Sequence, residues 1–252
     1  MAALTELVRY ADQLLAAGEF ADYCPNGLQI EGRPQVRLLV SGVTASQALI
    51  DAAVAAGADA LLVHHGYFWK GEDPRLVGMK GRRVAALLRA GVSLLAYHLP
   101  LDAHPELGNN AQLALRLGIT VDGAVDDRER HPLIPRGHFE QPYAPDALAE
   151  RIGRVLGRAP LHVAGGPARI RTVAWCTGAG QRFIDAAADA GVDAFISGEI
   201  SEPTAHVARE RGIHYYAAGH HATERYGVQA LGERLAAQFG LEHRFIDLDN
   251  PA

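Results

Sequence analysis

An internal repeat constrains the fold of this chain more than any other feature of its sequence. When the 252-residue chain is shifted by 134 positions, QALIDAAVAAGADA (47–60) lies over QRFIDAAADAGVDA (181–194) with nine identities in fourteen positions. Further along, GVSLLAYH from Gly91 matches GIHYYAAG from Gly212 in character. A repeat of this length indicates that the chain folds into two similar structural units.

Each copy of the repeat alternates short apolar runs with longer helix-like segments, the pattern of parallel strands joined by helices. Strands are expected at 36–43, 58–65 and 92–98 in the first copy and at 170–177, 192–198 and 213–219 in the second. Helices are expected at 46–57, 80–91, 181–191, 203–212 and about 222–239, and a last strand at 242–248. The sequence therefore predicts an α/β fold with mostly parallel sheets flanked by helices.

The order of these elements also suggests how the chain divides into domains. The segment 123–165, which contains several prolines, separates the two copies and is expected at the periphery of the second unit. The C-terminal helix and strand are expected to return to the first unit. We therefore expect a first domain of residues 1–122 plus 215–252 and a second, inserted domain of residues 123–214.

The composition narrows the possible partners. A formal net charge of −5 argues against general binding to nucleic acid or to an anionic membrane. No apolar run approaches the roughly 18 residues of a membrane span and the first residues form no basic leader, so we expect a cytoplasmic protein. Cys24 and Cys176 are far apart and in no CxxC pattern, so both are expected to be reduced.

Three polar clusters follow strands of the expected sheets. His64 and His65 close the second strand of the first copy, and HLPLDAH (98–104) follows its third strand. GHHATER (219–225) follows the third strand of the second copy. Ligands of open α/β sheets bind outside the carboxyl ends of the strands, so these three clusters form the candidate site.

The side chains in these clusters suit divalent transition metals. His64 and His65 supply imidazoles, Asp102 supplies a carboxylate, and His220 and Glu224 are spaced to share one face of a helix. A carboxylate can bridge two ions, so the set predicts two ions per subunit, which could be Zn, Fe, Mn, Co or Ni. Taken singly, the histidine pair is also explained as a cap or a core hydrogen-bonding pair, and the His–Glu pair as a surface contact.

The repeat indicates that such a site lies between the two units. The residues of the second copy that align with His64 and His65 are Gly198 and Glu199, so the second unit lacks a matching histidine pair. Its ligands must then come from the end of its third strand. Glu199 is expected to act as a base or an orienting group, or else to be a solvated loop acid. His98 and His221 lie inside the clusters but are not favoured as direct ligands.

Other chemistries find less support in the sequence. The chain has no P-loop, no GxGxxG motif after a strand and no GxSxG elbow. TGAGQ (177–181) could meet a phosphate at a helix N-terminus, but a tight turn is the favoured interpretation. Lys70 could steer an anionic substrate with its basic neighbours, although a solvated helix face explains at least three of the group; the neighbours are Arg75, Lys80, Arg82 and Arg83. Seven further histidines are expected to be structural or solvated: His104, His131, His138, His162, His206, His214 and His243.

Six motifs make the chain recognisable. They are NGLQIEG (26–32), GVTASQALIDAA (42–53), VHHGYFWKG (63–71), HLPLDAHPELGNNAQLA (98–114), SGEISE (197–202) and AAGHHATERYG (217–227). Together they resemble the type 2 GTP cyclohydrolase I family, the Nif-three-like family of dinuclear-metal hexamers, and most closely its YbgI-type bacterial branch. The resemblance covers essentially the whole chain. It implies a metal site in the cleft between two α/β domains, a ring of six subunits, and metal ligands at His64, His65, Asp102, His220 and Glu224.

The resemblance also implies an activity, the opening of the GTP imidazole ring to give formate and dihydroneopterin triphosphate. A metal-bound water would attack, and His98 or Glu199 would relay protons. The sequence contains no unambiguous motif for binding guanine or triphosphate. A metal-handling or partner-binding hexamer without this activity is therefore the alternative. A ring that encircles nucleic acid is disfavoured by the acidic balance of the chain.

Overall fold

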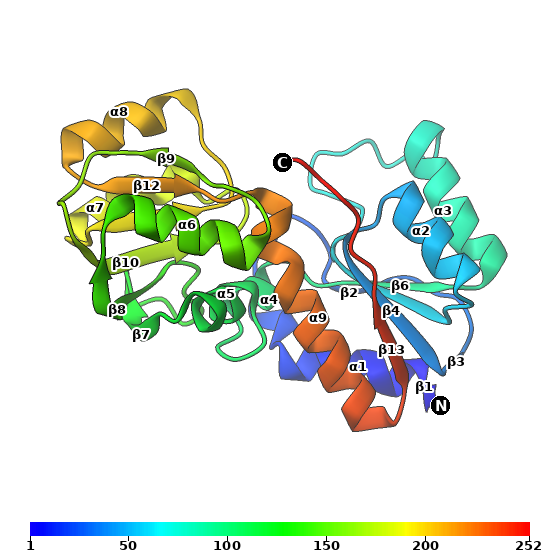
Figure 1. Ribbon diagram of the computed structural model, residues 1–252. Helices are drawn as coiled ribbons and strands as arrows, with labels where there is room; N and C mark the ends of the chain where they lie inside the picture. The colour runs from blue at the N-terminus through cyan, green and yellow to red at the C-terminus, as the bar shows by residue number, and fades with distance from the viewer. The chain divides into compact units, whose positions relative to one another are not determined.

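The computed structural model describes residues 1–252, and the chain forms two compact units (Figure 1). Unit 1 comprises Met1–Leu101 and Gly227–Asp249, and unit 2 comprises Asp102–Tyr226 and Asn250–Ala252. The chain passes from one unit to the other inside α4 (Leu99–Ala103), inside α9 (His220–Phe239) and again between Asp249 and Asn250. The sequence placed residues 102–122 and 215–226 in the first domain, whereas in the structure they pack with unit 2.

Unit 1 is built on a five-stranded sheet with the strand order β13-β4-β5-β6-β2. The strands are β13 (Glu242–Phe245), β4 (Leu38–Thr44), β5 (Ala60–His65), β6 (Ser93–Ala96) and β2 (Gly27–Ile30). The first four run parallel, and β2 pairs antiparallel with β6 at one edge. A separate two-stranded ribbon joins β1 (Ala2–Ala3) to β3 (Gln35–Val36).

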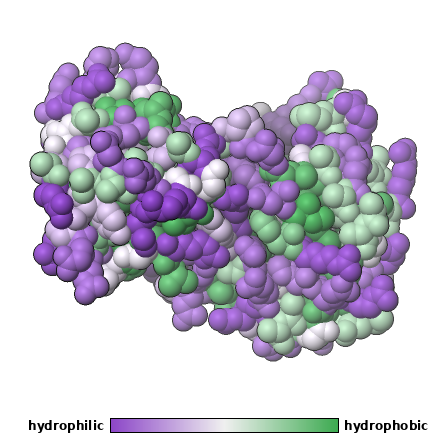
Figure 2. Space-filling model, in the orientation of Figure 1, coloured by the Kyte–Doolittle hydropathy of each residue, from purple (hydrophilic) through white to green (hydrophobic).

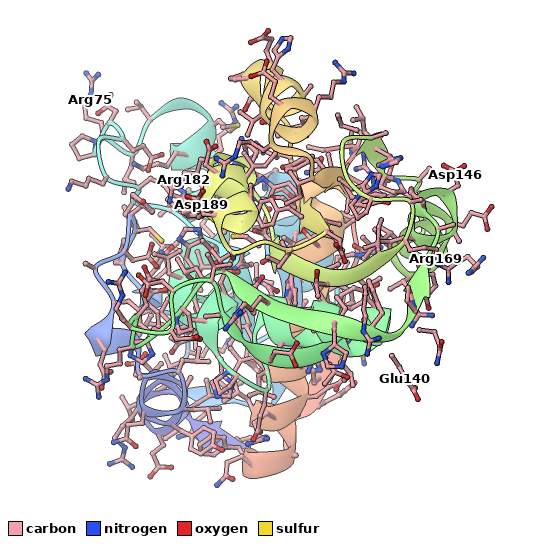
Figure 3. All side chains as sticks on the ribbon, turned by 90° about the vertical axis from the view of Figure 1, so that its left-hand side faces the viewer. Arg75, Glu140, Asp146, Arg169, Arg182 and Asp189 are labelled. Atoms are coloured by element: carbon pink, nitrogen blue, oxygen red, sulfur yellow. The ribbon has the colours of Figure 1, made fainter.

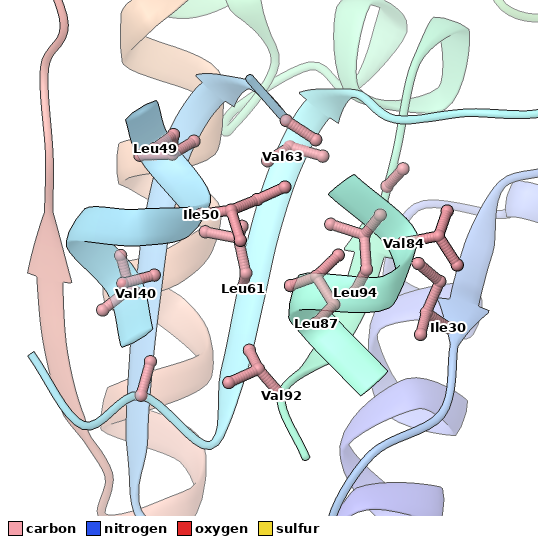
Figure 4. Close-up of a cluster of buried hydrophobic side chains, with 14 of the residues drawn as sticks. Ile30, Val40, Leu49, Ile50, Leu61, Val63, Val84, Leu87, Val92 and Leu94 are labelled. Atoms are coloured by element: carbon pink, nitrogen blue, oxygen red, sulfur yellow. The ribbon is translucent and has the colours of Figure 1, made fainter. Parts of the chain in front are cut away.

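Helices cover both faces of this sheet. Figure 4 shows α2 (Gln47–Ala55) and α3 (Gly78–Ala90) packed over one face, with Leu49, Ile50 and Leu87 directed at the strands. Helix α1 (Leu4–Leu14) and helix α9 lie behind the sheet in that view, and the short helix η1 (Ala17–Glu19) follows α1. The apolar faces of these helices and strands are removed from water together, which is the main stabilising term for such a layer.

Unit 2 carries a six-stranded mixed sheet with the order β7-β8-β10-β11-β12-β9. The parallel centre consists of β10 (Ile170–Cys176), β11 (Ala194–Ser197) and β12 (His214–Ala217). Antiparallel strands extend it on both sides, namely β7 (Thr120–Ala124), β8 (Pro135–Tyr143) and β9 (Leu161–Val163). The segment 123–165 therefore supplies β8, β9 and the end of β7 to the sheet of unit 2.

Two pairs of helices sandwich this second sheet. Helices α5 (Asn109–Leu117) and α6 (Pro145–Leu156) pack on one face around the fully buried Trp175. Helices α7 (Ile184–Asp189) and α8 (Glu202–Arg211) pack on the other face around Phe195 and Tyr215, and η2 (Gln181–Phe183) leads into α7. The α/β architecture with helix-flanked sheets is thus confirmed.

The internal repeat is visible in the strand register. Leu39 pairs with Ala60 in the parallel ladder of β4 and β5, and Val173 pairs with Ala194 in that of β10 and β11. Both pairs are related by the same shift of 134 residues that aligns the sequences. The third strands and the antiparallel edge strands β2 and β9 follow in equivalent register.

A half-buried aspartate occupies the same position in both copies. Oδ2 of Asp59 accepts hydrogen bonds from the backbone N–H groups of residues 37 and 38, at 2.9 and 3.1 Å. Oδ2 of Asp193 accepts from those of residues 171 and 172, at 2.9 and 2.8 Å. In each unit this carboxylate satisfies backbone donors at the start of the first strand, which explains why both copies keep an aspartate there.

Some element boundaries differ from those expected. Helix α9 begins at His220 rather than near Ala222, and the last strand ends at Phe245 rather than Leu248. None of the helices combines the length and the hydropathy needed to cross a lipid bilayer. Figure 2 shows hydrophilic and hydrophobic residues interspersed over the visible face of each unit.

Candidate metal-ligand clusters

The end of β5 brings two adjacent imidazoles close together in unit 1. His64 is fully buried, and its Nδ1 lies 2.9 Å from the carbonyl oxygen of Tyr97. A carbonyl can only accept, so Nδ1 carries the hydrogen and the lone pair of the ring is on Nε2. His65 is half-buried with Nδ1 3.3 Å from Oγ1 of Thr44, and the two ring centroids are 4.6 Å apart. Both imidazoles can therefore serve one site because the strand ends here.

His98 joins this pair from the end of β6. The ligand atoms of His64, His65 and His98 lie within 4.8 Å of one another. Nδ1 of His98 is 2.7 Å from Oδ1 of Asp22, and its backbone N–H donates to Oδ1 of Asn26, also at 2.7 Å. Asp22 thus fixes the ring and Asn26 the backbone of His98, and Nε2 is the nitrogen that is directed away from Asp22.

Asp22 remains ionised in this environment. Burial by itself would raise its pKa, but hydrogen bonds from His98 and from Asn26 outweigh burial and lower the pKa to about 2. The neighbouring Cys24 behaves in the opposite way, since burial and the charge of Asp22 raise the pKa of its thiol to about 12. Cys24 is therefore a neutral thiol and a poor metal ligand at neutral pH.

In unit 2, Asp102 is held by two donors from other elements. It is 8% exposed on α4, and its Oδ1 accepts from Nδ2 of Asn109 at 2.8 Å and from Oγ1 of Thr177 at 3.3 Å. Nδ2 of Asn110 donates to the backbone carbonyl of Asp102. Both side-chain donors bind the same carboxylate oxygen, so they set the orientation of the carboxylate.

The second cluster of unit 2 lies in the first turn of α9. Nδ1 of His220 is 2.7 Å from Oε1 of Glu199, and its Nε2 is 3.3 Å from Oε2 of the buried Glu224. Burial opposes protonation of His220, but Glu224 and then Glu199 outweigh it and raise its pKa to about 9. An imidazole between two carboxylates marks a place that favours positive charge. The contact with Glu199 thus fixes the orientation of the His220 ring.

A tight turn at Gly178 packs directly against this pair. Gly178 has a φ of 63°, and a Cβ atom there would lie 2.0 Å from Oε1 of Glu224 and 3.0 Å from Nε2 of His220. Its N–H donates to Oγ1 of Thr223. The favoured interpretation of TGAGQ as a tight turn agrees with this geometry, and the turn leads into η2 rather than into a long helix.

Acidic neighbours compensate the charges of some of the basic residues that follow β5. Arg75 points outward from its loop (Figure 3) and pairs with Asp73, and Lys80 lies 3.2 Å from a carboxylate oxygen of Glu72. Lys70 is exposed, and its backbone N–H donates to the carbonyl of Tyr23. Of this group, Lys70 is the residue closest in sequence to the histidine pair and the one that remains a candidate for meeting an anion.

Sequence reasoning missed the residues that orient the candidate ligands. Asp22, Asn26, Asn109 and Thr177 lie in loops or at helix ends without any spacing signal of their own. Asn26 and Asn109 fall in the motifs NGLQIEG and HLPLDAHPELGNNAQLA, and Thr177 begins TGAGQ at the end of an expected strand; these placements are the signals that could have pointed to them. His104 accepts two backbone N–H groups two and three residues later, which is the structural role expected for it.

Comparison with known proteins gives one consistent family. Residues 2–251 match the family model Duf34/NIF3 (NGG1p interacting factor 3). A curated protein from Pseudomonas aeruginosa, named GTP cyclohydrolase 1 type 2 homolog, is 59% identical over 251 residues, with 99% of each chain covered. A protein of the same name from Escherichia coli K12 is 55% identical, covering 98% of this chain and 99% of the relative.

Solved structures agree with this result. A structure of the protein ybgI, described as of unknown function, is 55% identical with a TM-score of 0.96 and full coverage of both chains. A protein from Thermus thermophilus is 38% identical with a TM-score of 0.87, covering 100% of this chain and 99% of the other. The resemblance indicated by the six sequence motifs is thereby confirmed.

Proposed function

Because the chain belongs to the Duf34/NIF3 family, we propose that it is a metal-dependent hydrolase of the GTP cyclohydrolase 1 type 2 kind. The name of its curated relatives supports a GTP-type nucleotide as the substrate class. The observation that carries the proposal is the arrangement around His220, whose ring lies between the carboxylates of Glu199 and Glu224. A histidine ligand oriented through its other nitrogen by a carboxylate is the usual arrangement at protein metal centres.

We propose that the chain would hold two divalent ions through five side chains, with Glu224 as a ligand that both ions would share. The five ligands are His64, His65, Asp102, His220 and Glu224. Their chemistry fits such ions, since imidazole nitrogens and carboxylate oxygens together suit Zn, Fe, Mn, Co or Ni. Two features of single residues support the fit: the Tyr97 carbonyl leaves the lone pair of His64 on Nε2, and the donors Asn109 and Thr177 fix the orientation of the Asp102 carboxylate.

His98 is the proposed proton carrier. When bound, divalent ions supply Lewis acidity and a nucleophile at neutral pH. Asp22 holds Nδ1 of His98, so Nε2 is the atom that exchanges a proton with the substrate. The Asp22 carboxylate stays ionised because its pKa is about 2, and its charge stabilises the imidazolium that forms. Asp22 therefore acts as a positioning residue for His98.

The setting of this reaction is proposed from the family resemblance. The substrate would be anionic, and Lys70 is exposed beside the histidine loop to meet its charge. The reaction would take up water, open the imidazole ring of GTP and release formate. A homohexamer in the cytoplasm is the assembly and location that we propose.

Formate release from GTP tests this function. The metal-loaded protein is assayed against GTP and against a panel of other phosphorylated and amide substrates, with metal content measured on the same samples. His98→Ala is expected to keep its metal and to lower turnover by roughly 10²–10⁴-fold, the contribution of one proton-transfer group. His206→Ala, an exposed histidine paired with Glu202, is the matched control.

Three outcomes would contradict the proposal. Unchanged turnover in His98→Ala would remove His98 from the reaction. Loss of metal in the same variant would make His98 a ligand instead. If no substrate in the panel is hydrolysed and the ions pass readily to an acceptor chelator, the protein is a metal carrier.

A further inference from the structure

Two aromatic side chains border the histidine cluster of unit 1. The ring of Trp69 lies edge-to-face with His98 at a centroid distance of 5.0 Å and 6.0 Å from His65. The ring of Tyr23 lies 6.4 Å from His98 at an interplanar angle of 64°. The two residues come from loops far apart in the sequence, and both meet the same imidazole.

Neither residue is positioned as a core aromatic. Tyr23 is 48% exposed and Trp69 is half-buried, whereas Trp175, the other tryptophan of the chain, is fully buried in the core of unit 2. The chain turns sharply just before Trp69, because Phe68 has a φ of 65°. Phe68 packs against the core of unit 1, and this turn lets the next side chain reach the histidines. A bulky residue with positive φ is costly and often accompanies a functional site.

The two loops are held together before any ligand binds. The backbone N–H of Lys70 donates to the carbonyl of Tyr23 at 2.6 Å. The side-chain amide of Gln29 donates to the carbonyls of Pro25 and Tyr67, and its Oε1 accepts from the N–H of Tyr67 at 2.7 Å. These hydrogen bonds connect residues 23–29 to residues 67–70. Both aromatic rings are therefore preorganised, which lowers the entropic cost of binding.

We propose that Tyr23 and Trp69 form an aromatic wall that recognises the planar heteroaromatic ring of the substrate, a nucleobase, beside the proposed metal ligands. The inference rests on the proposed function, which supplies the reaction and the substrate class, and it adds the residues that bind the base. Aromatic side chains bind bases by stacking on their flat faces, and this contact does not depend on the hydrogen-bonding groups of the base. The exposed ammonium of Lys70 follows Trp69 directly and is placed to meet the phosphate groups of the same ligand.

Binding of three probes separates base recognition from charge recognition. The dissociation constants of GTP, guanosine and inorganic triphosphate are measured for the metal-loaded protein. Trp69→Leu and Tyr23→Ala are expected to weaken GTP and guanosine by about tenfold or more and to leave triphosphate unchanged. Trp69→Phe and Tyr23→Phe, which keep a ring, should stay within a few-fold of the wild type. Tyr10→Leu removes an aromatic residue that packs on Phe239 instead and is the matched control.

The wild-type protein gives an independent measurement if a variant fails to fold. Because Trp175 is fully buried, acrylamide quenching of fluorescence reports mainly Trp69. Guanosine should protect against quenching and inorganic triphosphate should not. No protection by guanosine, or equal losses for all three probes in Trp69→Leu, would overturn the aromatic wall. The formate assay separates this inference from the proposed function. If the wild type releases formate but the variants bind guanosine as tightly as the wild type, only the aromatic wall is refuted. If guanosine binding depends on the two rings but no formate is released from GTP, only the reaction is refuted.

Discussion

Nδ1 of His220 lies 2.7 Å from a carboxylate oxygen of Glu199, while Nε2 of the same ring faces Glu224 at 3.3 Å. One imidazole therefore has an orienting carboxylate on one nitrogen and a candidate co-ligand on the other. Glu199 occupies the position of the second repeat copy that corresponds to His65 in the first. The two copies thus use the same strand end for different tasks, one to supply an imidazole and the other to orient one.

Removing the orienting carboxylate should weaken metal binding without unfolding the protein. Glu199→Ala is expected to lower metal affinity by about 10- to 100-fold, because Nδ1 of His220 loses its acceptor and the ring loses its orientation. Competition with a chelator measures this affinity. Glu202→Ala, an exposed glutamate three residues further along, should have no effect. Equal affinity of Glu199→Ala and wild type would show that Glu199 does not orient a ligand.

Removing the proposed bridging carboxylate should have a larger effect. Glu224→Ala is expected to lose both ions together, since a shared ligand contributes to both sites. Metal analysis after gentle purification should find close to two equivalents in the wild type and almost none in the variant. Glu233→Ala, on the exposed side of the same helix, serves as the control. A variant that retained its full metal content would contradict the bridging role.

The turn at Gly178 offers a test of how closely the backbone approaches the ligands. Gly178→Ala adds the strain of a positive φ, of order 1–3 kcal/mol, and also places a methyl group against Oε1 of Glu224. Gly191→Ala is a matched control, because its φ of 71° is similar and nothing lies within 4 Å of the added atom. Thermal melts and metal titrations should show loss of stability in both variants and loss of metal affinity only in Gly178→Ala. Similar metal affinity in the two variants would mean that the turn does not shape the site.

A pair of histidines should make unit 2 less stable in acid. Nε2 of His214 donates to the carbonyl of Pro167, so its Nδ1 accepts from Nε2 of His162 at 3.0 Å. Burial and then His214 lower the pKa of His162, with Asp146 partly opposing them. The unfolded chain, where histidine titrates near 6.5, then binds more protons than the folded one. Stability should be fully present above about pH 6.5 and fall as the pH drops below it.

Melting temperatures between pH 7.5 and 5 test this expectation. The decrease toward acid pH should be smaller in His162→Gln than in the wild type, because one titrating group is removed. His206→Gln, at an exposed histidine, should follow the wild-type profile. Identical profiles for His162→Gln and the wild type would show that this pair does not contribute to acid sensitivity.

Much of the fold was accessible from sequence because its signals are local. The repeat of 47–60 in 181–194 and the alternation of strands with helices depend on side-chain pattern over short windows, and the observed register preserves the same shift. The candidate ligands were also accessible, because parallel strands bring their carboxyl ends to one edge of a sheet. His64 and His65 stand at such an end, and His220 begins the helix that follows another.

The groups that orient those candidates were decided by tertiary structure alone. Asp22 reaches His98 across 76 residues of sequence, and Asn109 and Thr177 reach Asp102 from separate elements. The acceptor for His64 is a backbone carbonyl, that of Tyr97, and a carbonyl leaves no trace in residue type. Local pattern therefore determined which residues stand at the strand ends. Only the packing of distant loops decided how each ring and carboxylate is turned, because a hydrogen bond depends on atomic positions that no short stretch of sequence specifies.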